Sequence, residues 1–202
     1  MTSRVFLLSP AWCGGKRAAM LLRQAAVFPL ATRLRGDGAP LGEVFSFLSG
    51  LYFRGKLAYA RRFARAAARH PGLLIITPTR GLVEPDSPVT VADLKDFATV
   101  DIDEADARYS VPLKRDLDRL LAEDESVEVV LLGSVATGKY VEVLAETLGQ
   151  QLLFPVDFVG RGDMSRGGLM LRCARESREL TYAPVVGAIR HGPRPPKLER
   201  IR

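Results

Sequence analysis

Cysteine and histidine are scarce in this sequence, which limits the chemistry that it can carry. Only two cysteines, Cys13 and Cys173, and two histidines occur among 202 residues. A structural zinc site needs four nitrogen or sulfur ligands at characteristic spacing, so we expect no metal site, and no motif indicates another cofactor. Cysteine this sparse suits a reducing cytoplasm better than a disulfide scaffold, and we expect a cytoplasmic location.

Long apolar runs are also missing. The apolar stretch 5–8 is far shorter than a signal-peptide core or a membrane span, so no membrane partner is expected. Hydrophobic residues make up 47% of the chain and charged residues 26%, which is ordinary for a globular protein. A chain of this length can bury a full core. We expect one domain over 1–190 and a poorly ordered, Pro/Arg-rich tail over 191–202.

Acidic residues are outnumbered by basic ones. The 29 lysines and arginines exceed the 23 acidic residues and give a net charge of +6. Such a balance favours an anionic partner such as nucleic acid, although it does not indicate a fold. Arginine makes up much of the excess, and a GC-rich genome alone favours arginine.

Apolar runs and helical patterns alternate along the chain. Short apolar runs bounded by turn formers predict buried strands over 4–8, 73–77 and 127–134. The segment 151–158 fits either a final strand or an extended crossover. Apolar residues at helical spacing predict the helices. Their expected ranges are 16–34, interrupted near Pro29, then 56–69, 113–122 and a helix ending at 148. This alternation predicts an α/β fold, a single domain with a mainly parallel central sheet flanked by helices.

The first motif is SPAWCGGKR, residues 9–17, which directly follows the first predicted strand. Open α/β sheets keep their ligand sites at the ends of such strands. Gly14 and Gly15 free the backbone to turn its N–H groups toward an anion, and Lys16 adds positive charge. The alternatives are an ordinary turn and a reactive-cysteine loop around Cys13. Because no histidine-based partner is evident, we favour anion binding over a reactive thiol.

The second motif, GSVATGKY at 133–140, repeats this arrangement after the strand 127–134. It offers Ser134, Lys139 and Tyr140 at the start of a helix. Neither glycine turn matches the Walker A pattern GxxxxGK[ST], and a simple helix cap is the alternative. Because both turns lie at the ends of predicted buried strands, we expect them to face one crevice.

Two charged loops are further candidates. In TPTRGLVEPDSP, residues 77–88, Arg80 would present a cation and Asp86 would orient it or act as a base. The sequence GRGDMSRGG, residues 160–168, predicts a flexible loop that attracts anions through its arginines and carries Asp163. The alternatives are a solvated surface loop for the first segment and a hinge or linker for the second.

Aromatic and basic side chains alternate over 52–65. Tyr52 and Phe53 beside Lys56 suit stacking on bases and contacts with phosphates. More often such aromatics belong to the core and such basic residues face solvent. We favour the core for Phe53 and Phe63, and keep Tyr52, which lies between two glycines, as a stacking candidate.

In order, these motifs resemble those of the YaaA family of peroxide stress-response proteins. SPAWCGGKR resembles its SPAK-type opening, SGLYFRG its aromatic-glycine segment, and IITPTRGLVEPDSPV its second strand and loop. LLGSVATGKYVEVL and GRGDMSRGGLM resemble two later segments, so the likeness spans roughly residues 5–172. The chain is shorter, as in the related DUF6884 group. The resemblance implies an α/β protein that binds DNA in a positively charged cleft and is connected with protection from oxidative damage. It leaves glycosidic chemistry on a base or nucleotide open.

Three functions stay open, and with them the question whether the chain is an enzyme. The first is a DNA-binding protein with a basic cleft that processes bases as a DNA glycosylase does, in DNA-damage or stress defence. The others are a small-molecule enzyme acting on a nucleotide or phosphorylated sugar, and a non-catalytic stress protein. The candidate catalytic residues are Asp86, Asp163 and Tyr52. The candidate phosphate- or nucleic-acid-binding residues are Ser9, Gly14, Gly15, Lys16, Arg80, Ser134, Lys139, Tyr140, Arg161 and Arg166.

Overall fold

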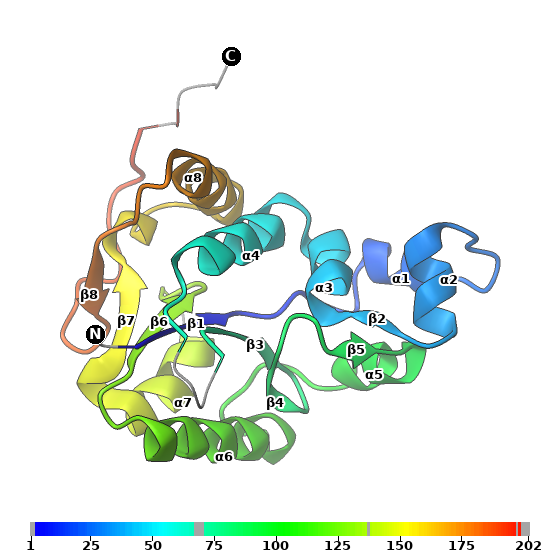
Figure 1. Cartoon of the computed structure of the whole chain (residues 1–202), viewed down its shortest axis with the longest axis horizontal. Coiled ribbons are helices and arrows are strands. Elements are labelled where there is room, and N and C mark those ends of the chain that lie inside the picture. The colour runs from blue at the N-terminus through cyan, green and yellow to red at the C-terminus, as the bar shows by residue number, and fades with distance from the viewer. Residues whose placement is uncertain (1–2, 67–70, 137, 197, 199–202) are drawn as a thin grey trace.

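Six strands form the central sheet in the order β4-β3-β1-β6-β7-β8 (Figure 1). This computed structural model describes residues 3–66, 71–136, 138–196 and 198. The four inner strands run parallel, and each edge strand runs antiparallel to its neighbour. The strands are β1 Arg4–Leu8, β3 Leu73–Thr77, β4 Gly81–Val83, β6 Glu128–Leu132, β7 Leu152–Pro155 and β8 Tyr182–Pro184. The predicted α/β domain with a mainly parallel sheet flanked by helices is confirmed.

The inner strands are apolar because both of their faces are covered. Every residue of β1 is buried, and successive side chains point to opposite faces of the sheet. Phe6 and Leu8 join one core cluster, and Val5 and Leu7 join the other. Burial on both faces explains why these strands have continuous apolar sequences instead of alternating ones.

Two pairs of helices form the outer layers. Helices α4 (Leu51–Phe63) and α8 (Asp163–Glu176) cover one face, and α6 (Ala107–Glu123) and α7 (Gly138–Leu148) cover the other (Figure 1). After β1 the chain passes over the α4 face, whereas after β6 it enters α7 on the opposite face. The chain therefore leaves β1 toward one face of the sheet and leaves the neighbouring strand β6 toward the opposite face. Ligand sites of open α/β sheets lie at such a point.

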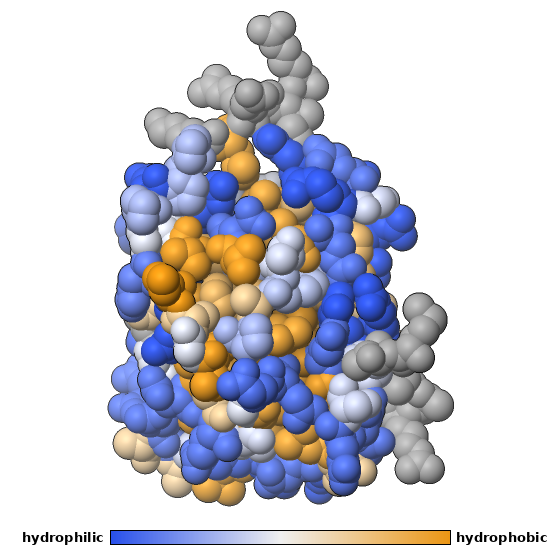
Figure 2. Space-filling model, turned by 90° about the vertical axis from the view of Figure 1, so that its left-hand side faces the viewer, coloured by the Kyte–Doolittle hydropathy of each residue, from blue (hydrophilic) through white to orange (hydrophobic). Residues whose placement is uncertain are grey.

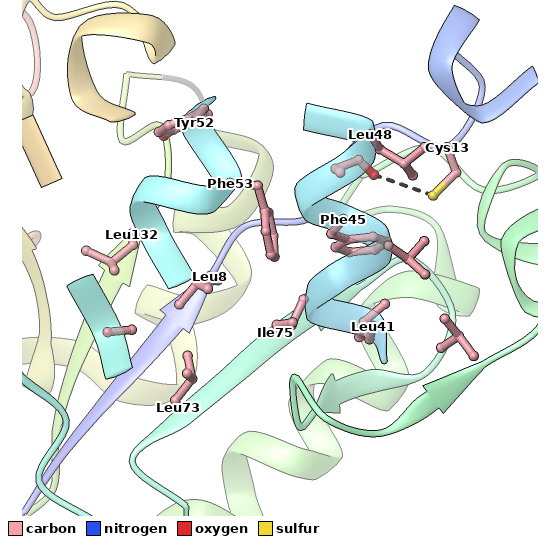
Figure 3. Close-up of a cluster of buried hydrophobic side chains, with 14 of the residues drawn as sticks. Leu8, Cys13, Leu41, Phe45, Leu48, Tyr52, Phe53, Leu73, Ile75 and Leu132 are labelled. Carbon is pink, nitrogen blue, oxygen red and sulfur yellow. Dashed lines mark hydrogen bonds between the residues drawn. The ribbon is translucent and has the colours of Figure 1, made fainter. Parts of the chain in front are cut away.

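The remaining elements form a lobe beside the carboxyl ends of the inner strands (Figure 1). Within it, Phe45 makes edge-to-face contacts with Phe53 of α4 at 5.4 Å and with Phe97 at 6.3 Å between ring centroids. Figure 3 shows Phe45 and Phe53 turned toward each other between their helices. The lobe thus shares the core of the sheet. Its elements are α1 Lys16–Leu22, α2 Pro29–Arg35, β2 Ala39–Pro40, α3 Leu41–Ser49, β5 Pro88–Val89 and α5 Val91–Phe97; the short helices η1 Gly149–Gln151 and η2 Val156–Phe158 flank β7.

Several predicted helix boundaries are wrong. The helix expected over 56–69 is α4, which begins at Leu51 and ends at Phe63. It ends because Ala64 turns to an extended conformation and Arg65 exchanges two backbone hydrogen bonds with Arg4, at 3.0 and 3.1 Å. Residues 67–69 of that prediction lie outside the described part of the chain.

Another boundary shifts for a local reason. The helix expected over 113–122 is α6, which starts at Ala107 because the Asp106 carboxylate accepts a hydrogen bond from the Arg108 backbone N–H. The interruption expected near Pro29 in the helix 16–34 is confirmed, since α1 ends at Leu22 and α2 begins at Pro29.

The largest correction concerns 160–168, predicted as a flexible loop. Helix α8 begins at Asp163 and contains the two later glycines of that segment. A Cβ atom on Gly167 would lie 2.8 Å from the Leu51 carbonyl oxygen, and one on Gly55 would lie 2.5 Å from the Gly167 carbonyl oxygen. These glycines allow α4 and α8 to approach closely and do not make the segment flexible.

Figure 2 views the left-hand side of Figure 1, where β8 lies, and shows apolar side chains gathered among hydrophilic ones. Val186 and Ile189, which follow β8, are among the exposed large apolar residues.

None of the helices in the described ranges combines the length and the apolar character that crossing a bilayer requires.

Two adjacent glycines of α8 give a test of the close helix contact. We expect Gly167→Ala to lower the free energy of unfolding by about 1–3 kcal/mol, because its Cβ meets the α4 backbone. The control is Gly168→Ala, whose Cβ would lie 3.6 Å from Leu198 Cδ1. It should leave stability unchanged or raise it by up to about 1 kcal/mol, since alanine favours helix. Urea unfolding of both variants measures the difference, and equal stabilities would contradict the close contact.

Candidate functional site

A cavity of about 470 Å³ opens at the carboxyl ends of β1 and β6. The loop after β1 forms one wall and the turn after β6 another, while α4 and α8 each contribute one side chain from above the sheet. The connection between α5 and α6 forms the remaining wall. The cavity falls within the range of small-molecule sites. Its lining is Ser9–Cys13, Ser49, Tyr52, Pro78, Phe97, Val100, Asp101, Ile102, Ser134, Lys139, Tyr140 and Asp163.

The two strand-end turns of the sequence motifs meet in this cavity. The turn after β1 contributes Ser9, and the turn after β6 contributes Ser134, Lys139 and Tyr140. The candidates Tyr52 and Asp163 line it as well. The expected common crevice therefore exists.

Two other candidates lie elsewhere. Arg80 is exposed and pairs with Asp93 at 3.1 Å, and it lines a separate depression between β4 and α6. The Asp86 side chain is 77% exposed and pairs with Arg61 at 2.8 Å. Because β4 runs antiparallel to β3, the loop that carries Asp86 returns along the sheet edge, away from the crevice. Asp86 and Arg80 therefore do not belong to the cavity.

The remaining predicted cations do not line the cavity either. Lys16 is exposed at the start of α1, and Arg161 donates to the Asp157 carbonyl at 2.9 Å and to Ser165 Oγ at 3.2 Å. Arg166 is 5% exposed and donates through Nε and Nη2 to the Phe158 carbonyl. Its Nη1 lies 3.5 Å from Asp163 Oδ1, so it holds the start of α8. Lys139 is the one cation among the described residues that lines the cavity.

Trp12 lies at the mouth of the cavity and is 78% exposed. Its ring packs on the glycine turn, because a Cβ on Gly14 would be 3.1 Å from Trp12 Nε1 and one on Gly15 would be 3.2 Å from Trp12 Cε3. Any larger residue at these two positions would press on the indole. The glycines that suggested an anion cradle thus also make room for an aromatic ring that faces solvent.

Lys56, on the buried face of α4, contacts Ser9 and is 1% exposed. Its Nζ donates to the Ser9 carbonyl oxygen at 2.7 Å and contacts Ser9 Oγ at 2.9 Å. The ammonium also lies 4.3 Å from the ring centroid of Tyr52 and 4.9 Å from that of Phe53. Burial lowers the pKa of Lys56 to about 7; nearby Asp163 opposes this shift and Arg166 adds to it.

The two cavity tyrosines are weak acids. Burial raises the pKa of Tyr140 to about 12, with the Asp163 carboxylate adding to the effect. Burial raises the pKa of Tyr52 as well, against the smaller lowering effect of the Arg166 guanidinium. Tyr52 Oη is buried and makes no well-formed hydrogen bond within the described residues. Both hydroxyls therefore stay protonated at neutral pH, and neither acts as a base there.

Cys13 is a packing residue. Its side chain is 4% exposed in an apolar cluster, and its Sγ donates to the Ala11 carbonyl at 3.5 Å (Figure 3). Desolvation raises the pKa of the thiol to about 12, so almost no thiolate forms at neutral pH. The structure thus argues against the reactive-cysteine alternative. Within the described residues, no group of three or more His, Cys, Asp and Glu side chains could hold a metal ion.

Sequence reasoning placed Lys56 with the basic residues of 52–65 and missed its burial. The side chain of Lys56 lies on the buried face of α4 with Tyr52 and Tyr59. Phe53 is buried, as expected, and Phe63 is partly buried against the same core. Since Tyr52 and Lys56 are four residues apart and Tyr59 follows at three, a lysine at helical spacing between two tyrosines was the available signal.

Comparisons with protein-family models, with curated proteins and with solved structures give no significant match. The resemblance to the YaaA family therefore stays a prediction.

The buried lysine makes stability depend on pH in a defined direction. The folded pKa of Lys56 lies near 7, below the unfolded value of 10.5, so the unfolded state binds the extra proton between these values. Wild-type stability should therefore gain about 1.4 kcal/mol per pH unit from this residue between pH 7 and 10. The variant Lys56→Met lacks this gain.

Urea unfolding of both proteins at several pH values measures the gain. The free energy of unfolding of Lys56→Met minus that of the wild type should fall as pH rises from 7 to 10 and stay constant below pH 6. A difference independent of pH would mean that Lys56 keeps an ordinary pKa. Lys114→Met, which removes an exposed lysine of α6, is the control.

Proposed function

We propose that the chain is a DNA-binding protein that takes a single base into the crevice between β1 and β6 and acts on its glycosidic bond. The observation that carries the proposal is the pairing of an exposed tryptophan with a cavity of nucleoside size. The resemblance to the YaaA family supports the same function.

The cavity suits a planar heterocycle. Tyr52, Phe97 and Tyr140 offer aromatic surface, and Ser9 and Ser134 offer hydroxyls that can donate or accept. A base taken out of a nucleic acid strand is read in this way, by stacking and by hydrogen bonds to its edge. Trp12 at the mouth gives the neighbouring base a stacking surface, which is typical of single-strand binding.

The charges around the mouth set the path of the phosphates. A groove that shares Ser49 with the cavity is lined by Arg17 and Arg54. Lys139 also lines a second depression, together with the acidic residues Asp103 and Glu104. The strand therefore runs over the α1–α4 side, where cations attract phosphates, and avoids the acidic α5–α6 connection.

Asp163 is the candidate carboxylate for the chemical step. It lines the cavity at the start of α8, its side chain is 63% exposed, and Arg166 approaches it at 3.5 Å. In the proposed step the carboxylate accepts a proton from the water that adds to the sugar carbon. The C–N bond breaks, and the base leaves with the bonding electrons and takes a proton from solvent.

A second candidate function is the binding of a free nucleotide. It is favoured by the scarcity of cations in the cavity, where Lys139 alone would meet a phosphate among the described residues. Both candidates place the base in the same cavity and differ in whether the groove with Arg17 and Arg54 is used.

Fluorescence anisotropy with single-stranded, duplex and abasic DNA at several salt concentrations tests the proposal. Trp12→Ala should weaken binding by about 1–3 kcal/mol, the value of one stacked base. Arg54→Ala should reduce the salt slope by about one phosphate contact. The charge-matched control is Arg119→Ala on α6, where the side chain is 70% exposed. Binding of mononucleotides but not DNA would favour the second candidate, and binding of neither would overturn both.

Alkali treatment of the bound DNA tests the chemical step. Release of a base leaves an alkali-labile site, and Asp163→Asn should reduce its formation about 100-fold or more, the usual contribution of a general base. Asp86→Asn should have no effect, because Asp86 lies outside the cavity. DNA binding without labile sites would leave a DNA-binding protein without glycosidic activity.

A further inference from the structure

Ser9 and Lys56 form a pair that the proposed base binding does not require. Ser9 follows the last residue of β1 and lines the cavity, and Lys56 reaches it from the buried face of α4. Nζ of Lys56 lies 2.9 Å from Ser9 Oγ. A serine hydroxyl in contact with a buried lysine is one of the arrangements that produce an activated nucleophile.

The surroundings hold this contact in place. Nζ also donates to the Ser9 carbonyl oxygen at 2.7 Å, so the two hydrogen bonds fix the ammonium on one residue. The Ser9 hydroxyl itself donates to the Leu132 carbonyl over a long distance, 3.4 Å. A Cβ on Gly133 would lie 3.0 Å from Ser9 Cβ and 3.1 Å from Oγ, so the glycine of the second motif makes room for this side chain.

The protonation state of Lys56 decides what the pair can do. Charged Lys56 can only donate to Oγ, whereas neutral Lys56 offers a lone pair that accepts the hydroxyl proton. The groups that act on Nζ are Tyr52 on its own helix and Asp163 and Arg166 on α8. Asp163 favours the charged form, while burial and Arg166 favour the neutral form. With a pKa near 7, a large neutral fraction exists in ordinary buffers.

We infer that Ser9 is a nucleophile activated by Lys56 and that the cavity accepts an acyl group, the carbonyl of an ester or amide. Neutral Lys56 Nζ takes the proton of Ser9 Oγ while Oγ adds to the carbonyl carbon. The carbon–heteroatom bond breaks, and the leaving alcohol or amine takes the proton from Lys56. Water then adds to the acyl-Ser9 carbonyl with Lys56 as base, releases the acid and restores the hydroxyl.

This inference goes beyond the proposed function, because it assigns another reaction to the same cavity. It shares Ser9 with base binding, where the Ser9 hydroxyl is one of two hydrogen-bonding groups, but otherwise it depends on different residues. Base binding depends chiefly on Trp12 and the aromatic walls, and the glycosidic step depends on Asp163, whereas acyl transfer requires Ser9 Oγ together with Lys56 Nζ. The two proposals can therefore fail separately.

Phenylmethanesulfonyl fluoride is the probe, since it reports an activated serine without knowledge of the substrate. Ser9 Oγ adds to sulfur, fluoride leaves with the S–F bonding electrons, and Lys56 retains the proton. Intact-mass measurement should show one adduct, and peptide mapping should place it on Ser9. The labelling rate should rise with pH through about 7 and then level off, because neutral Lys56 is required.

Matched variants separate activation from chance labelling. Ser9→Ala should abolish the adduct, and Lys56→Met should slow labelling about 100-fold. Ser110→Ala and Lys114→Met on α6 are the controls and should label at the wild-type rate, because neither residue lines the cavity.

An unlabelled wild type, an adduct on another serine, or a rate that does not change between pH 6 and 9 would overturn the inference. If Lys56→Met does not fold, the wild-type pH profile and the Ser9→Ala variant still decide it. Labelling of Ser9 without any binding of DNA or nucleotides would support acyl chemistry and reject the proposed function. Binding of DNA or nucleotides without labelling of Ser9 would support the proposed function and overturn the acyl-transfer inference.

Discussion

The site depends on one contact, that of the buried Lys56 ammonium with the end of β1. Removing an ammonium from water is costly unless hydrogen bonds replace the lost hydration. Here the Ser9 carbonyl and hydroxyl and two aromatic rings surround it. The contact requires α4 to lie close above the strand. The glycine contact between α4 and α8 brings the helices together and places Tyr52 and Asp163 at the same opening. Packing between these two helices thus determines which of their side chains face the cavity.

Much of the architecture could be predicted from the sequence because local rules suffice for it. Strands buried on both faces have continuous apolar sequences, and three such runs located β1, β3 and β6. Glycine turns directly after two parallel strands must lie at the same edge of the sheet, so the meeting of Ser9 with Ser134 followed from the order of elements. The cavity could be anticipated to this extent from strand ends alone.

The rest depends on tertiary contacts that the sequence does not express locally. Asp86 follows a strand as Ser9 does, but that strand, β4, runs antiparallel and carries it away from the crevice. Arg80 lies in the turn between β3 and β4, where it pairs with Asp93 and lines a separate depression. The glycines of 160–168 suggested flexibility, yet Gly167 is required by the close contact with α4, a helix that starts more than a hundred residues earlier. Lys56 belongs to a helix with several arginines, and its burial follows from which face meets the sheet. In each case a contact with a segment distant in the sequence determines where the residue lies and whether it is buried.

The two proposals together restrict what the cavity can hold. Ser9 is both a hydrogen-bonding group for a base edge and the proposed nucleophile, so a bound base that donates to Oγ would block attack. A ligand that fits both would have to place its ring against Tyr140 and Trp12 and its carbonyl carbon above Ser9. Protonation of Lys56 also links the two uses, because the charged form makes the Ser9 hydroxyl a donor into the cavity and the neutral form makes it a nucleophile. Binding and chemistry at Ser9 should therefore respond to pH in opposite directions.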